Sequence, residues 1–143
     1  MLPISKELIN EIAELLDCGF RCFINKTNAE LISIPNELNH SYIETDTWSK
    51  EIQILKDNNL EYFEIEPLES RDYFLIMEDF LDTLPSNKIK NKLKNALENK
   101  KPFKNFKFII DNSDEYRNAW FEFKKQKLQE WVVEKYNNFY RIE

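Results

Sequence analysis

Cys18 and Cys22 are the only two cysteines of the chain, and they are separated by three residues. Thiolates bind zinc, but a structural zinc site takes about four ligands. The only histidine, His40, lies far away in an acidic stretch, and there is no second cysteine pair. We therefore predict two free thiols of small apolar character, a reducing cytoplasm and no metal site.

Carboxylates gather at Glu78, Asp79 and Asp82, inside a segment with helical periodicity. Adjacent residues of a helix point about 100° apart. Glu78 and Asp79 therefore do not form the converging pair that a glycosidase requires. Two or three carboxylates on one helix could hold a divalent cation. A metal-dependent enzyme that uses helix carboxylates stays open as an alternative beside a solvated, ion-paired face.

Nucleophilic catalysis would depend on His40, because it is the only imidazole base of the chain. The chain also has a single glycine, Gly19. A nucleotide-binding loop or a nucleophile elbow needs more glycines than that. We assign no catalytic residue and expect no cofactor, so the sequence favours a role without catalysis.

Basic residues concentrate in the second half of the chain. Residues 1–87 hold 6 Lys/Arg and 18 Asp/Glu, whereas residues 88–143 hold 14 and 8. The segment 88–107 carries eight lysines against one acid, with Phe103 and Phe106 among them. Basic residues interleaved with aromatics can bind nucleic acid. The sequence pI near 5.0 and the lack of an RNA-binding motif make that alternative less favoured, and we expect Phe103 and Phe106 to be core residues.

A charge-divided surface suits a protein partner or a second copy of the chain. We predict a non-catalytic protein-interaction or regulatory module, which acts on another protein or as a homodimer. No apolar run approaches the length of a membrane span, and no leader is apparent, so we expect a cytoplasmic protein that does not bind membranes. The predicted interaction surface comprises Arg71, Glu78, Asp79, Lys104, Lys107 and Trp120.

The elements of the N-terminal half alternate between helix and strand. Ser5 is expected to cap a helix that Gly19 ends in the left-handed conformation. A hairpin of about 20–34 follows, then a polar loop at 36–46 and a short helix from Trp48. A third strand is expected at about 60–66. Together these predict a small three-stranded antiparallel sheet.

The C-terminal half has helical periodicity throughout. We expect Ser70, Ser86 and Ser113 to cap three of its helices, and Pro102 to lie near the start of another. An N-terminal helix and this helical half would pack on the sheet. The fold class is therefore α+β, in a single domain of residues 1–143.

Several ordered motifs resemble one known family. Ser70-Arg71-Asp72-Tyr73 and Ile76-Met77-Glu78-Asp79-Phe80 are followed by Ala96-Leu97, by K-K-P-F-K-N-F-K at 100–107 and by W-F-E-F-K at 120–124. This pattern is similar to uncharacterised protein family 0158, a bacterial family of small proteins, mainly over residues 70–135. Many relatives carry Gly-Ala where this chain has Lys101-Pro102, a difference expected to change the backbone of that turn. The resemblance supports the fold and implies no chemistry.

Overall fold

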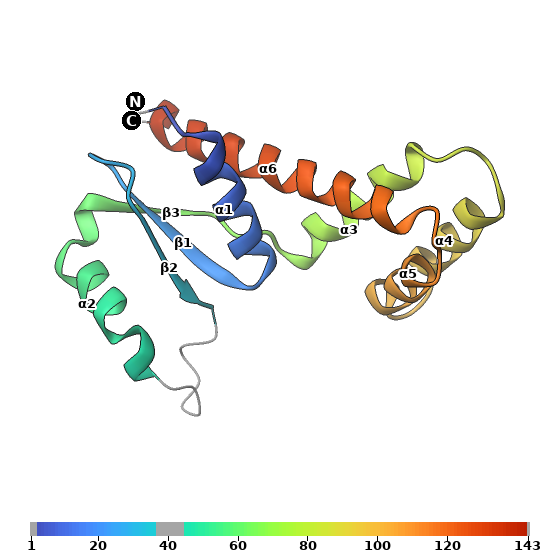
Figure 1. Cartoon of the computed structure of the whole chain (residues 1–143), viewed down its shortest axis with the longest axis horizontal. Coiled ribbons are helices and arrows are strands. Elements are labelled where there is room, and N and C mark those ends of the chain that lie inside the picture. The colour runs from blue at the N-terminus through green and yellow to red at the C-terminus, as the bar shows by residue number, and fades with distance from the viewer. Residues whose placement is uncertain (1–2, 37–44, 143) are drawn as a thin grey trace. The chain divides into compact units, whose positions relative to one another are not determined.

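The computed structural model describes residues 3–36 and 45–142, and it divides into two compact units. We call Met1–Pro67 with Leu128–Glu143 the sheet unit, and Leu68–Lys127 the helical unit. The sheet unit holds α1 (Lys6–Asp17), β1 (Phe20–Asn25), β2 (Leu31–Pro35), α2 (Ser49–Asp57) and β3 (Tyr62–Ile65), with short 3-10 turns at Thr45–Trp48 and Asn59–Glu61. The helical unit holds α3 (Ser70–Asp82), α4 (Lys88–Glu98) and α5 (Pro102–Asp111). Helix α6 (Arg117–Ile142) begins in the helical unit and ends in the sheet unit (Figure 1).

The predicted α+β class and three-stranded antiparallel sheet are confirmed. The strand order is β2-β1-β3, so the hairpin strand β1 is central. Cys22 of β1 pairs with Ser33 of β2 and with Ile65 of β3. β3 begins two residues later than about 60, because Asn59–Glu61 forms a 3-10 turn. Cys22 and Ile65 are completely buried, which places the core of the sheet unit on their face of the sheet.

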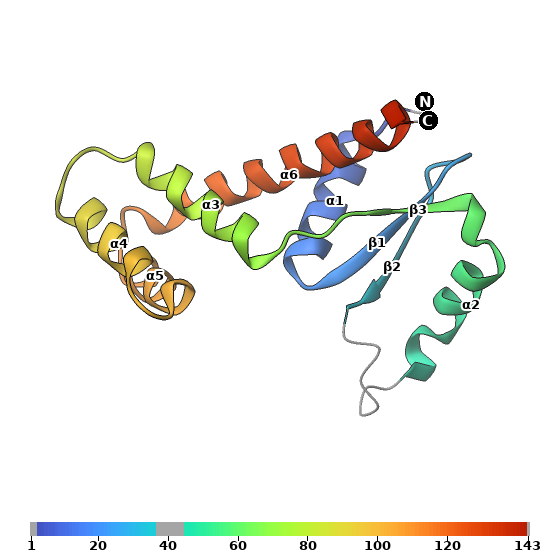
Figure 2. The ribbon, with the colours of Figure 1, turned by 180° about the vertical axis from the view of Figure 1, so that it is seen from behind.

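α1 and the end of α6 supply that core. The predicted Ser5 cap is confirmed, since its Oγ accepts a hydrogen bond from the Leu8 N–H at 3.1 Å. Gly19 follows the helix with φ +86°, also as predicted. The ring of Phe63 in β3 stacks on Phe139 of α6 with 3.9 Å between centroids. α1 and α6 run close together in both ribbon views (Figures 1 and 2), and Gln129 donates a hydrogen bond to Asn10.

Three helix starts in the second half differ from the prediction. α3 is capped by Glu69 rather than Ser70, and the Glu69 N–H donates to the Asp72 carboxylate at 2.8 Å. α4 is capped by Asn87 rather than Ser86. α6 begins only at Arg117, well after Ser113. Carboxylates and amides accept from free N–H groups as well as serine does, so a serine alone does not locate a helix start.

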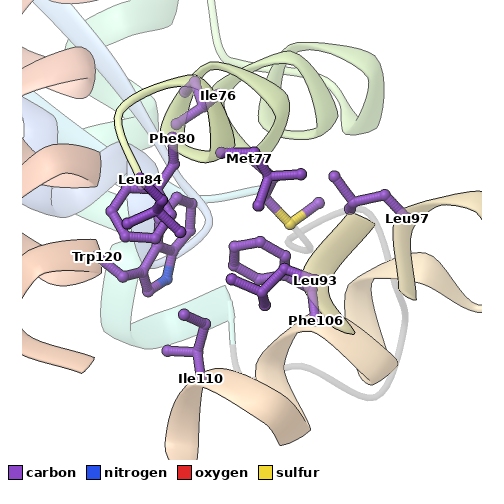
Figure 3. Packing of buried hydrophobic residues seen from close by; sticks show 10 residues of the cluster. Ile76, Met77, Phe80, Leu84, Leu93, Leu97, Phe106, Ile110 and Trp120 are labelled. Carbon is purple, nitrogen blue, oxygen red and sulfur yellow. The ribbon is translucent and has the colours of Figure 1, made fainter. Parts of the chain in front are cut away.

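The helical unit has its own hydrophobic core (Figure 3). Side chains from α3, α4, α5 and the first turn of α6 meet there, and they include Phe80, Leu93, Phe106 and Trp120. None of the described helices is both long and apolar enough to cross a membrane. α6 serves both cores, because Trp120 is buried in the helical unit and Tyr136 in the sheet unit. The single domain of residues 1–143 stays a prediction.

The N-cap of α5, Lys101, has a left-handed backbone with φ +56°. This lysine therefore has a backbone conformation that glycine adopts more readily than any other residue. We expect Lys101→Gly to raise the free energy of unfolding by about 1 kcal/mol, because a side chain costs about that much in this region. Urea denaturation measures it.

The matched control is Lys104→Gly, the same replacement inside α5. There glycine is expected to lower the free energy of unfolding by about 1 kcal/mol. An equal loss for both variants would contradict the conformational explanation.

The two thiols are expected to differ in reactivity. Cys18 is exposed, whereas Cys22 is buried and its burial, with Glu64 and Glu11 nearby, raises the pKa of the thiol to about 12. Below that pH the Cys22 thiol stays protonated, and only a thiolate reacts readily. Mass spectrometry after maleimide treatment at neutral pH should show one modified residue, Cys18, and two in denaturant. Modification of Cys22 in the folded protein would show that β1 is accessible.

Candidate functional site

The helical unit contains a cavity of about 350 Å³ between α3, α5 and the start of α6. Residues one helical turn apart contribute from each helix, so each presents one face to the cavity. The lining residues are Ser70, Tyr73, Met77, Phe103, Phe106, Lys107, Ile110, Asp111, Trp120, Phe121 and Lys124. Most of them are apolar. This composition is typical of a binding site rather than of a surface channel.

The inner wall of the cavity is part of the hydrophobic core. The Trp120 ring meets the Phe106 ring edge to face, with 4.9 Å between centroids, and the Phe80 ring at 5.3 Å. Phe106 and Trp120 are 2% and 9% exposed. Both rings therefore belong to the packed core and line the cavity at the same time.

The outer wall is aromatic and exposed. Phe103 is 41% and Phe121 is 44% exposed, although both side chains belong to the lining. The prediction that Phe103 and Phe106 are both core residues is right for Phe106 and wrong for Phe103. The two residues lie almost one turn apart on one face of α5. Phe106 packs against Trp120, whereas Phe103 lies in the first turn of the helix and reaches solvent. Exposed aromatic side chains beside a cavity are typical of interaction sites.

The charged groups around the cavity are mainly basic. The Lys124 Nζ lies over the Tyr73 ring, 5.7 Å from its centroid, and Lys107 is exposed. Among the described residues, Asp111 is the only acid of the lining, and its Oδ1 lies 3.8 Å from the Nε of Arg117. Arg117 in turn stacks over Phe121 at 5.3 Å. The described lining therefore holds two lysines, Lys107 and Lys124, and one acid, Asp111.

The structure brings two of the six predicted surface residues together. Lys107 and Trp120 line the cavity, whereas Arg71, Glu78, Asp79 and Lys104 do not.

Helix geometry explains why Glu78 and Asp79 do not line the cavity. Glu78 follows the lining residue Met77 by one position, so it lies about 100° around α3, and Asp79 lies about 160° away from Met77. Both are exposed. Arg71 and Lys104 are also exposed and lie next to Ser70 and Phe103 in the chain. Over residues 3–36 and 45–142, no three His, Cys, Asp or Glu side chains lie close enough to hold a metal ion, and His40 falls outside those residues.

Sequence reasoning missed Tyr73, Phe121 and Lys124 as site residues. A signal for them was present, because all three belong to the motifs that carry the family resemblance. Every lining residue except Ile110 and Asp111 lies in one of those motifs. The motifs are far apart in the chain, so only the tertiary structure places them around one cavity.

The fold and this site define a small α+β protein with an apolar, basic-edged cavity in its helical unit. A model of the uncharacterised protein family UPF0158 matches residues 1–141, so the chain belongs to this family. The resemblance is thus confirmed, and it extends beyond residues 70–135 into the N-terminal half.

One curated relative is UPF0158 protein PA5073 of Pseudomonas aeruginosa. It is 31% identical over 70 residues, which cover 49% of this chain and 46% of the relative. The matched stretch thus spans about half the length of the curated relative. No solved structure matches the chain. The family description assigns no activity, so the function must be argued from the site.

The two phenylalanines of α5 should separate stability from binding. We expect Phe106→Ala to lower the free energy of unfolding by about 3 kcal/mol, because it opens a hole beside Trp120 in a packed core. Phe103→Ala should change it by less than about 1 kcal/mol, since that ring is already partly in solvent. Chemical denaturation followed by Trp fluorescence measures both. A larger loss for Phe103→Ala than for Phe106→Ala would reverse the assignment of inner and outer wall.

Proposed function

We propose that this chain is a non-catalytic protein-interaction module whose helical unit binds an acidic segment of another protein. The observation that carries the proposal is the apolar cavity of about 350 Å³, which has exposed aromatic rings at its edge and Lys107 and Lys124 among its lining residues. The segment would insert one large apolar side chain into the cavity. Its acidic groups would pair with the lysines outside.

The apolar part of the interaction follows from the exposed rings. Phe103 and Phe121 expose aromatic surface to water, and a bound side chain would remove that surface from water. Apolar burial contributes about 25 cal/mol for each Å² removed from water. Binding energy at protein interfaces concentrates in such aromatic pockets. A single anchoring side chain therefore suffices for a specific contact.

The polar part of the interaction follows from the charges. Lys107 and Lys124 favour carboxylates, and the exposed Lys104 extends the same charge along α5. Basic groups around an apolar pocket select the partner's charge and speed up its association. A segment rich in Asp and Glu with one aromatic or aliphatic residue matches both requirements.

Binding without catalysis is the simpler use of these groups. Within the part of the chain that the structure describes, the lining contains hydroxyls at Ser70 and Tyr73 but no histidine or cysteine that could activate one of them. The single carboxylate, Asp111, is paired with Arg117. These groups can hold a partner through hydrogen bonds and charge. They do not form the nucleophile and base arrangement that acyl transfer needs.

The predicted surface residues that do not line the cavity would contact other parts of the partner. Arg71 would extend the basic edge beside Ser70, where an acidic segment leaves the cavity. Glu78 and Asp79 would contact a second, basic part of the partner. The free thiols of Cys18 and Cys22 fit the cytoplasm as the working compartment. A homodimer is the alternative assembly, in which the partner is a second copy.

A peptide array tests the proposal directly. The purified chain is applied to short peptides that vary in net charge and in the presence of one Phe, Trp or Leu. We expect it to bind acidic peptides that contain the large apolar residue, and not their basic or apolar-free counterparts. In calorimetric titration, Phe121→Ser and Lys107→Glu should each lower the affinity for the selected peptide about ten-fold or more.

Lys125→Glu is the matched control, because it makes the same charge change on α6 but does not line the cavity. It should leave binding nearly unchanged. Selection of basic peptides, binding to no peptide, or an equal loss in the Lys125→Glu variant would each contradict the proposal.

A further inference from the structure

A second hollow of about 300 Å³ lies between α4 and α5, on a different face of the helical unit. α4 contributes residues at helical spacing, and α5 contributes from the side that does not line the apolar cavity. The lining residues are Lys92, Asn95, Ala96, Asn99, Asn105, Phe108 and Ile109. None of them lines the first cavity. The two hollows are therefore separate sites.

Three of the seven lining residues of this second hollow are asparagines. Neither the Asn95 nor the Asn99 side chain bonds any residue in the parts of the chain that the structure covers. Asn105 uses its Nδ2 as a donor to the Lys100 carbonyl at 2.9 Å, which leaves its Oδ1 as an acceptor. An amide offers a donor and an acceptor side by side. This pairing matches the edges of nucleobases, which also present donors and acceptors side by side.

An exposed aromatic ring stands beside these amides. Phe108 is 69% exposed, more than Phe103 or Phe121 at the first cavity. Its neighbour Phe106 points into the core and is 2% exposed, so Phe108 contributes little to packing. A flat ring in solvent next to hydrogen-bonding groups can stack on a base of any type.

Lysines border the hollow on both helices. Lys88 lies one turn before Lys92 on α4, and Lys104 lies one turn before Phe108 on α5. All three lysines are exposed. The segment 88–107 has eight lysines and one acid, so its local charge is strongly positive although the whole chain is acidic. Lys92 lines the hollow, and an ammonium group beside a stacking ring can hold a phosphate.

We infer that the α4–α5 hollow binds single-stranded nucleic acid, with a base stacked on Phe108 and with phosphates held by Lys92 and its neighbouring lysines. The asparagines contact the edge of the base. This site goes beyond the proposed protein interaction and does not depend on it, because α5 uses opposite faces for the two hollows. A purely acidic chain such as polyglutamate would satisfy the lysines, but it has no base that could stack on the ring.

Fluorescence anisotropy with labelled oligo(dT) and oligo(rU) tests this inference. We expect the whole chain to bind at low ionic strength, with an affinity that falls as salt rises. Binding of either strand supports the inference. The affinities for oligo(dT) and oligo(rU) together show whether the chain prefers DNA or RNA. Phe108→Ala should weaken binding about ten-fold, because a stacked base loses its partner. Lys92→Gln should reduce the slope of log affinity against log salt by about 0.7.

Polyglutamate and Phe121→Ser are the controls. Polyglutamate presents negative charge without bases, so it should compete poorly with the oligonucleotides. Phe121→Ser alters the first cavity and should leave nucleic-acid binding unchanged. The inference is overturned if neither strand binds at low salt, if polyglutamate competes as well as the unlabelled strand, or if Phe108→Ala binds as tightly as the unaltered chain. Phe108 is exposed, so loss of folding does not explain a change in this variant.

Discussion

The Trp120 indole packs edge to face on Phe106 of α5 and on Phe80 of α3. Through this one side chain, the first turns of α6 hold two other helices in position. Edge-to-face contacts restrict the relative orientation of the rings more than aliphatic packing does. The apolar cavity exists because Phe106 and Trp120 form its inner wall while neighbouring residues reach solvent. The packing of the helical unit and the wall of its cavity therefore depend on the same side chain.

The helical unit carries more basic than acidic residues, and the sheet unit carries more acidic than basic ones. The second and the first half of the sequence differ in the same way. Leu68–Lys127 contains 13 Lys/Arg and 10 Asp/Glu, whereas the sheet unit contains 7 and 16. The basic groups are also used differently within the helical unit. Lys107 and Lys124 border an apolar cavity, while Lys92 borders a hollow lined by amides. The two hollows therefore differ in the side chains that surround their lysines.

Local signals located most elements of the fold. The Ser5 cap, the Gly19 turn, the hairpin and the third strand depend on residues close in the chain, and all are found in the structure. Helix starts were predicted less well. Glu69 and Asn87 replace the expected serines as caps, because several polar side chains compete for the same free N–H groups.

The sequence by itself determined the α+β class, the charge division and the family motifs, because each depends on composition or on short-range order. It also placed Lys107 and Trp120 in the predicted surface. Only the tertiary structure decided that Tyr73, Phe121 and Lys124 join them, and that Phe103 reaches solvent while Phe106 is buried. The physical reason is that helical periodicity defines the faces of each helix, whereas packing between distant helices decides which face is buried and which lines a cavity.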